Sequence, residues 1–120
     1  MTEAQHQSTL MKWTQQPEIR AAYPELKLLF HIPNGGRRDP IEAKHLKDQG
    51  VKKGVPDLCL PVAGGGYHAL YIELKTEKGR TSKEQEWWLA ELCRQGNYTA
   101  VCHGWEEAAH CLIWYLTQTT

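Results

Sequence analysis

Two acidic residues and a lysine are spaced in this 120-residue sequence so that they can act together. Asp57 lies in the first of two segments in which polar and apolar residues alternate, and Glu73 and Lys75 lie in the second. Such alternation is typical of β-strands with one apolar face. The glycines at 64–66 between the segments predict a hairpin turn. A turn centred on Gly65 places Asp57 opposite Glu73, with Cβ atoms about 5 Å apart.

Two carboxylates at that separation repel each other and need a compensating positive charge. A hard divalent cation such as Mg²⁺, with carboxylate and water ligands, supplies that charge. Lys75 shares the face of Glu73 and adds a fixed cation. Such a site can activate a water molecule and stabilise developing negative charge. The alternative is a polar outer face of the hairpin with weak surface ion pairs, and a register shift would also separate the carboxylates.

The rest of the sequence predicts the elements that position these residues. Hydrophobic periodicity, capping residues and turn residues define each element. In chain order we first expect a helix over 3–16 with Leu10, Met11 and Trp13 on its apolar face, a strand over 26–32, and a short helix that begins after the N-cap Asp39 and ends near Gly50. Strands over 55–62 and 68–76 follow, and then a helix that is capped by Thr81 or Ser82 and ends before Gly96. The last two elements are a strand over 98–103 and a helix with Trp105, Ala109, Leu112, Ile113 and Leu116 on its inner face. The order α-β-α-β-β-α-β-α predicts an α/β fold with a mixed sheet flanked by helices.

Length and composition limit the class of protein. With 41% hydrophobic and 23% charged residues, the chain is expected to form a single globular domain over residues 1–120. No apolar run approaches the roughly 18 residues of a membrane span, and the first residues lack the pattern of a secretory signal. We therefore expect a cytoplasmic protein without membrane contact.

The net charge is zero, but the charges are unevenly distributed. Residues 37–53 carry six basic and three acidic side chains, whereas residues 81–120 carry two basic and five acidic ones. Neutrality thus excludes a broadly basic surface but allows a local basic patch. The same charges also fit an ordinary solvated loop and helix face.

The four cysteines are far apart and form no C-x-x-C pair, which argues against a zinc ribbon or a redox motif. The group Cys102, His103, His110 and Cys111 contains metal-ligating types. Adjacent residues, however, point in different directions on a strand or a helix. We expect reduced thiols, as is usual in the cytoplasm.

Short motifs around the acidic residues resemble a known family. Gly54-Val55-Pro56-Asp57 and Ile72-Glu73-Leu74-Lys75 are similar to the signature of PD-(D/E)XK nucleases. The flanking segments 32–37 (IPNGGR), 50–57 (GVKKGVPD) and 78–85 (KGRTSKEQ) closely resemble the VRR-NUC (virus-type replication-repair nuclease) family, above all its small stand-alone phage and bacterial members. The resemblance extends from Glu3 to the last helix. The α-β-β-β-α-β core of the superfamily matches the predicted order if the helix at 40–49 is an insertion.

The resemblance implies roles for six residues around one metal site. Asp57 and Glu73 would ligate Mg²⁺ or Mn²⁺ together with the backbone carbonyl of Leu74. Lys75 would hold the attacking water. Glu3 would support the metal through water or a second ion, and Gln85 would be a polar residue near the site. For Glu3 the alternative is an ordinary surface residue near the N-terminus.

A second group of residues is suited to contact the phosphates of DNA. Backbone N–H groups of a glycine-rich turn, guanidinium groups and ammonium groups all bind phosphate without reading sequence. The candidates are Asn34, Gly35, Gly36, Arg37, Arg38, Lys52 and Lys53. A simple tight turn at 34–36 is the alternative. Trp87 and Trp88 cannot share one narrow helix stripe, so one is expected in the core and the other at a subunit contact.

The resemblance therefore implies a metal-dependent DNA endonuclease of replication or repair. By analogy with Holliday-junction resolvases, it would be a homodimer that acts on branched or four-way DNA in a bacterial or phage-infected cell. A nickase or flap-type nuclease of the same family is one alternative. A DNA-binding module without turnover is another, although binding alone does not require two closely opposed carboxylates.

Overall fold

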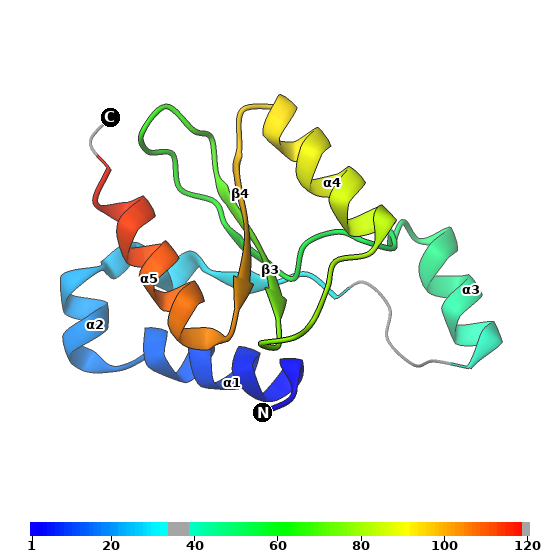
Figure 1. Cartoon of the computed structure of the whole chain (residues 1–120), viewed down its shortest axis with the longest axis horizontal. Coiled ribbons are helices and arrows are strands. Elements are labelled where there is room, and N and C mark those ends of the chain that lie inside the picture. Colours follow the sequence, from blue (N-terminus) through cyan, green and yellow to red (C-terminus); the bar gives the residue numbers. More distant parts are fainter. Residues whose placement is uncertain (34–38, 119–120) are drawn as a thin grey trace.

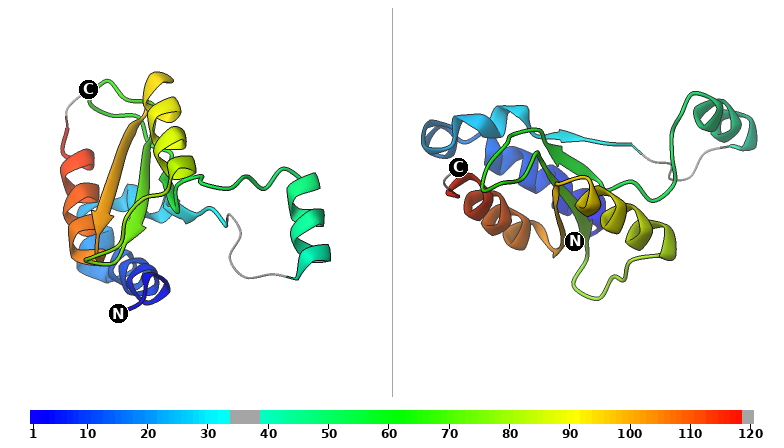
Figure 2. Two further views of the ribbon diagram at one scale, coloured as in Figure 1. Left: turned by 45° about the vertical axis from the view of Figure 1, so that its right-hand side comes forward. Right: turned by 90° about the horizontal axis from the view of Figure 1, so that it is seen from above.

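The computed structural model describes residues 1–33 and 39–118. It contains a four-stranded mixed sheet with helices on both faces (Figures 1 and 2), which confirms the predicted fold class. The elements are α1 (Glu3–Thr14), α2 (Pro17–Ala22), a 3₁₀ helix η1 (Pro24–Leu28), β1 (Phe30–His31), α3 (Pro40–Asp48), β2 (Leu58–Leu60), β3 (Leu70–Lys75), α4 (Lys83–Arg94), β4 (Tyr98–His103) and α5 (Trp105–Leu116). No helix in the described part of the chain is long and apolar enough to cross a membrane.

The strands lie in the order β1-β2-β3-β4, with the first three antiparallel and β4 parallel to β3. Helices α1 and α5 pack on one face of the sheet and α4 on the other (Figure 1). The core on the first face consists of apolar side chains from strands and helices: Leu10, Leu58, Leu60, Leu70, Ile72, Leu74, Leu112 and Tyr115. Ala108 and Tyr115 of α5 were not predicted to be inside, whereas Ala109 and Leu112 were.

The hairpin has the predicted register. Leu58 pairs with Ile72 and Leu60 with Leu70, so the position before β2 lies opposite Glu73. The turn itself is tight, because Gly64 and Tyr67 exchange two backbone hydrogen bonds. Gly65 and Gly66 between them have positive φ angles, as a type I′ turn requires. The paired strands are shorter than the predicted segments 55–62 and 68–76.

The strand predicted over residues 26–32 is wrong in its first half. Pro24 begins the 3₁₀ helix η1, and only Phe30 and His31 pair in the sheet. Leu26 and Leu29 are both buried. A spacing of three places two side chains on the same side of a 3₁₀ turn, whereas on a strand they would point to opposite faces. Burial of this leucine pair therefore favours the helical turn.

The predicted N-caps of α3 and α4 are confirmed. Asp39 accepts a hydrogen bond from the Glu42 backbone N–H, and Ser82 forms a full capping box with Gln85. Helix α3 ends before Gly50, which has a φ of 102°. This helix buries none of its residues and projects from the rest of the molecule (Figure 2).

Candidate active site

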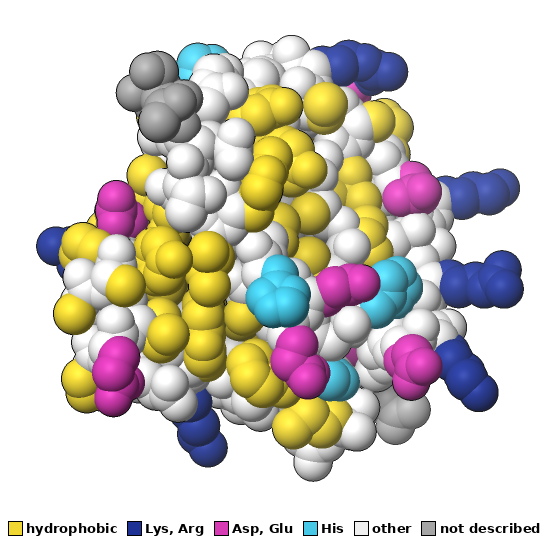
Figure 3. All heavy atoms as spheres, turned by 60° about the vertical axis from the view of Figure 1, so that its left-hand side comes forward, with side chains coloured by type: hydrophobic (Ala, Val, Ile, Leu, Met, Phe, Trp, Pro, Cys, Tyr) yellow, Lys and Arg dark blue, Asp and Glu magenta, His cyan; other side chains and the backbone are white. Residues whose placement is uncertain are grey.

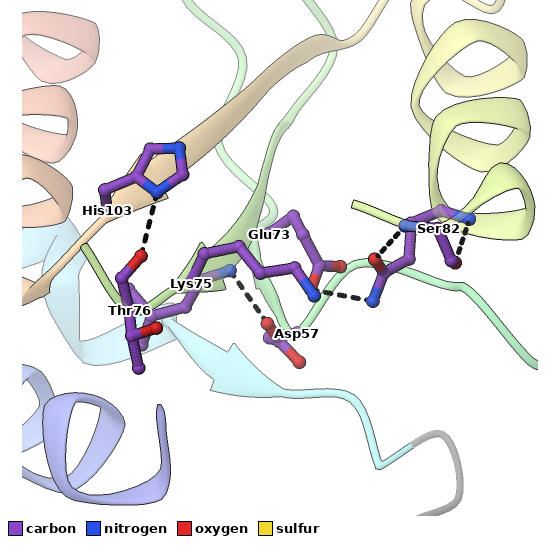
Figure 4. Close-up of polar contacts among 8 residues, drawn as sticks. Asp57, Glu73, Lys75, Thr76, Ser82 and His103 are labelled. Atoms are coloured by element: carbon purple, nitrogen blue, oxygen red, sulfur yellow. Dashed lines mark hydrogen bonds and ion pairs between the residues drawn. The ribbon is translucent and has the colours of Figure 1, made fainter. Parts of the chain in front are cut away.

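Asp57, Glu73 and Lys75 converge beside the end of the hairpin (Figure 4). Asp57 directly precedes β2, and its Oδ2 accepts a hydrogen bond of 2.8 Å from the backbone N–H of Leu74. The Lys75 Nζ lies 3.8 Å from Oε2 of Glu73. Helix α4 covers this face of the sheet, so Glu73 is only 1% exposed and Lys75 8%. The alternative of a solvated outer face with weak surface pairs is therefore wrong.

Gln85 fixes the Glu73 carboxylate from the first turn of α4. Its Nε2 donates to Oε2 of Glu73 over 3.2 Å. Its Oε1 accepts from the Ser82 backbone N–H over 2.8 Å, which completes the capping box. The cap thus determines which end of the Gln85 amide faces the carboxylate. A helix start and a site contact are provided by one side chain.

Burial, as the largest cause, and the nearby Asp57 carboxylate, through its charge and a hydrogen bond, together raise the pKa of Glu73 to about 8. Lys75 acts in the opposite direction and only partly offsets these effects. The Glu73 Oε1 is buried and has no hydrogen-bond partner among the residues that the structure describes. A buried carboxylate oxygen without a donor is costly unless a cation binds it. The residues present therefore fit a hard divalent cation.

The Leu74 carbonyl is a suitable third oxygen donor. Successive residues of a strand direct their N–H and C=O groups to opposite neighbours. The Lys75 carbonyl accepts from Gly104 on the β4 side, and the Leu74 N–H donates to Asp57 on the opposite side. The Leu74 carbonyl is thereby directed to the β2 side of β3, the side on which Asp57 lies. Two carboxylates and one carbonyl leave room for water and a phosphate oxygen, as Mg²⁺ prefers.

Within residues 1–33 and 39–118, no group of three or more His, Cys, Asp or Glu could hold a metal ion. This result does not support the group of Cys102, His103, His110 and Cys111 as a metal site. The structure has Cys59, Cys93, Cys102 and Cys111 as free thiols, with Cys93 exposed.

Glu3 is exposed in the first turn of α1. Its charge contributes to the raised pKa of Glu73, which places it within electrostatic reach of the site. Its role through water or a second ion stays a prediction.

The predicted DNA-contact residues are only partly described. Lys52 and Lys53 are exposed, and the Lys53 Nζ lies 3.8 Å from Oε1 of Glu84 on α4. Gly54 has a φ of +94°, and a Cβ there would lie 2.7 Å from the Glu84 carbonyl carbon. The chain before Asp57 therefore packs closely on the helix that carries Gln85. The other five candidates, Asn34, Gly35, Gly36, Arg37 and Arg38, lie outside the described residues.

His31 is a site residue that the sequence analysis missed. Its Nδ1 lies 2.9 Å from the backbone carbonyl oxygen of Asp57, which also accepts from the Ile32 N–H over 2.7 Å. Because a carbonyl only accepts, Nδ1 carries the hydrogen. These two bonds fix the backbone that carries the Asp57 carboxylate. A histidine in the otherwise apolar run Leu28–Ile32 was the available signal.

We expect His31→Gln to reduce cleavage at saturating DNA about 10-fold or more, since a supporting residue of a metal site typically contributes that much. His31→Asn should retain most activity, because the Asn amide nitrogen can occupy the position of Nδ1. The measurement is the single-turnover cleavage rate, with thermal unfolding to check the fold. Equal loss in both variants would argue against a positioning role for Nδ1.

A buried acid and a half-buried acid with a lysine, at the end of an antiparallel hairpin that is followed by a parallel strand, agree with the PD-(D/E)XK signature that the sequence resembles. The chain matches the VRR-NUC domain over residues 1–106 and belongs to that family. A solved structure described as a VRR_NUC domain protein superposes with a TM-score of 0.84; the two chains are 27% identical, and the match covers 99% of this chain and 91% of the other. No curated protein matches the chain. Membership of the family implies a nuclease with DNA as its substrate.

Proposed function

We propose that the protein is a metal-dependent DNA endonuclease that hydrolyses phosphodiester bonds, with branched DNA as its preferred substrate. The observation that carries the proposal is the buried Glu73 carboxylate, which has one unpartnered oxygen and adjoins both Asp57 and Lys75. A surface that only binds DNA has no use for two adjoining acids, one of them buried, since carboxylates repel phosphate.

Asp57, Glu73 and the Leu74 carbonyl would hold Mg²⁺, for which Mn²⁺ can substitute. When bound, the ion supplies an activated water and stabilises charge on the phosphate. Gln85 keeps Glu73 oriented through its Nε2. Lys75 brings a nearly buried ammonium group to the same face, where it orients the attacking water and offsets negative charge on the scissile phosphate. None of these residues needs to form a covalent intermediate.

Selectivity for branched DNA is supported by the zero net charge, because a neutral protein attracts duplex DNA weakly and must recognise shape.

We propose that two copies present two active sites to one junction. Apolar side chains gather on the side of the molecule that carries α5 and α2 (Figure 3). Strand β4 is an edge strand, with Val101 36% and Trp114 of α5 43% exposed. Such surfaces suit a subunit contact, which sedimentation over a range of concentrations would detect.

Cleavage of a matched set of substrates tests the proposal. Four-way junction, flap, nicked duplex and linear duplex of one sequence are incubated with Mg²⁺, Mn²⁺ or EDTA. We expect cleavage in either metal, fastest on the four-way junction, and none in EDTA. Preference for the flap or the nick would favour the related nuclease activities. Binding of every substrate without cleavage of any would show a DNA-binding module instead.

A further inference from the structure

A surface pocket of about 300 Å³ lies beside the N-terminal half of α4 and is not used by the proposed chemistry. It is lined by Lys53, Lys83, Glu84, Trp87 and Trp88. From the sequence, one of the two tryptophans was expected in the core. Instead Trp88 is half-buried and Trp87 is 57% exposed. A large indole left open to water between two lysines needs an explanation other than core packing.

The walls of this pocket are held in place. The Trp88 Nε1 donates to the backbone carbonyl of Lys53 over 3.1 Å. Trp87 and Trp88 meet edge to face, with ring centroids 5.4 Å apart. Such a contact covers at most one face of one ring, so each indole keeps a face free of the other. The pocket therefore presents a preformed aromatic surface, which lowers the entropic cost of binding a flat ligand.

The pocket adjoins the active site along the chain in two ways. Gln85, which contacts Glu73, lies between Glu84 and Trp87 on the same helix. Lys53 belongs to the segment that enters Asp57, and Gly54 packs against Glu84. A DNA strand at Asp57 and Glu73 would thus have its neighbouring nucleotides near this pocket.

We propose that the pocket binds one unpaired nucleobase of the DNA substrate by stacking on Trp87, while Lys53 and Lys83 contact the adjacent phosphates. This inference deepens the proposed nuclease function and rests on it. Aromatic side chains flanked by cations bind single-stranded DNA in this way, whatever the base. A base inside a duplex is already stacked on both faces, so the pocket would favour the unpaired nucleotides of a flap or an open branch point.

The charges of the pocket agree with a nucleic-acid ligand. The pair between Lys53 and Glu84 is long, at 3.8 Å, and solvent-exposed, so it contributes little and the ammonium group is free to turn to a phosphate. A subunit contact centred on Trp87 would have to desolvate two lysines and a glutamate. Lysine and glutamate are depleted from protein interfaces for this reason.

The test measures binding without cleavage. Fluorescence anisotropy in EDTA compares a labelled duplex that carries a short single-stranded flap with a blunt duplex of the same length. Trp87→Ala should weaken binding of the flapped DNA about 5- to 150-fold, the range found for loss of one stacking side chain, and leave binding of the blunt duplex unchanged. Trp87→Phe, which retains a stacking ring, should recover most of the loss. Because Trp87 is exposed, both variants are expected to fold, which circular dichroism would check.

Three results would overturn the inference. The first is an equal loss of affinity for flapped and blunt DNA in Trp87→Ala, and the second is no loss of affinity for either. The third is a shift of the oligomeric state in Trp87→Ala at unchanged DNA affinity, which would identify a subunit contact. The outcome is distinguishable from that of the proposed function, since the assay needs neither metal nor turnover. If the protein binds flaps through Trp87 but never cleaves DNA, the role of this pocket stands and the proposed nuclease function is wrong.

Discussion

Asp57→Asn is expected to lower the rate of DNA cleavage by about 100- to 1,000-fold, the size of effect found when one electrostatic group of an active site is removed. The substitution replaces one oxygen that is proposed to ligate the metal by an amide nitrogen. It retains the oxygen that accepts from the Leu74 N–H, so the junction between β2 and β3 and the thermal stability should change little. DNA affinity in EDTA should remain near that of the unchanged protein, since the substitution removes one acidic group and no basic group.

Asp48→Asn is the matched control for that experiment. Asp48 is an exposed carboxylate on α3 that pairs with Lys44 one helical turn earlier, and such a pair contributes little. The same chemical change there should leave cleavage unaltered. Undiminished cleavage by Asp57→Asn would overturn the site assignment, and loss in both variants would point to an effect of charge rather than of metal ligation.

The acid pair is the part of the site that local sequence predicts best. Three glycines between two alternating segments fix the hairpin and its register, and register alone decides which residues lie opposite each other. The observed pairing of Leu58 with Ile72 agrees with that expectation. The capping box at Ser82 is equally local, since it depends on two residues three positions apart.

Features that depend on distant contacts were not predictable from local patterns. The polar face of the hairpin alternates like a solvated face, yet α4 packs over it and buries Glu73. His31 reaches the Asp57 carbonyl only because β1 pairs with β2, 26 residues further along the chain. Residues 26–29 continue the apolar run that leads into β1, but burial of Leu26 and Leu29 together selects a 3₁₀ turn. In each case tertiary packing overrides local preference.

The capping role of Gln85 also explains why a helix begins beside the acids. The capping box requires a Gln or Glu at this position, and only Gln has an amide N–H to donate to a carboxylate. A glutamate would cap the helix equally well but would add a third negative charge beside Asp57 and Glu73. The sequence thus satisfies a local structural requirement with the one residue type that also suits the site.

Affinity for Mg²⁺ is expected to rise about 10-fold per pH unit up to about pH 8 and to level off above it. Burial and the Asp57 carboxylate hold the pKa of Glu73 at about 8 in the metal-free protein, so near neutral pH this group is mostly protonated. A metal ion needs the carboxylate, and binding must therefore release about one proton. Calorimetric titration in two buffers with different ionisation enthalpies measures that proton directly. A pH-independent affinity without proton release would contradict the prediction.

The same pKa fixes the sign of the pH dependence of folding. The unfolded chain ionises Glu73 near its ordinary pKa, whereas the folded chain resists ionisation until about pH 8. The folded state therefore binds more protons between these values, so the stability of the metal-free protein falls as pH rises through this interval.

Glu73→Gln should reduce this dependence of stability on pH in EDTA, whereas Glu84→Gln, at an exposed helix position, should retain it. Added Mg²⁺ should raise the melting temperature at pH 8 more than at pH 6, because only the charged site binds the ion. The cost of ionising the buried Glu73 would thus be offset by the metal ion that binds its carboxylate.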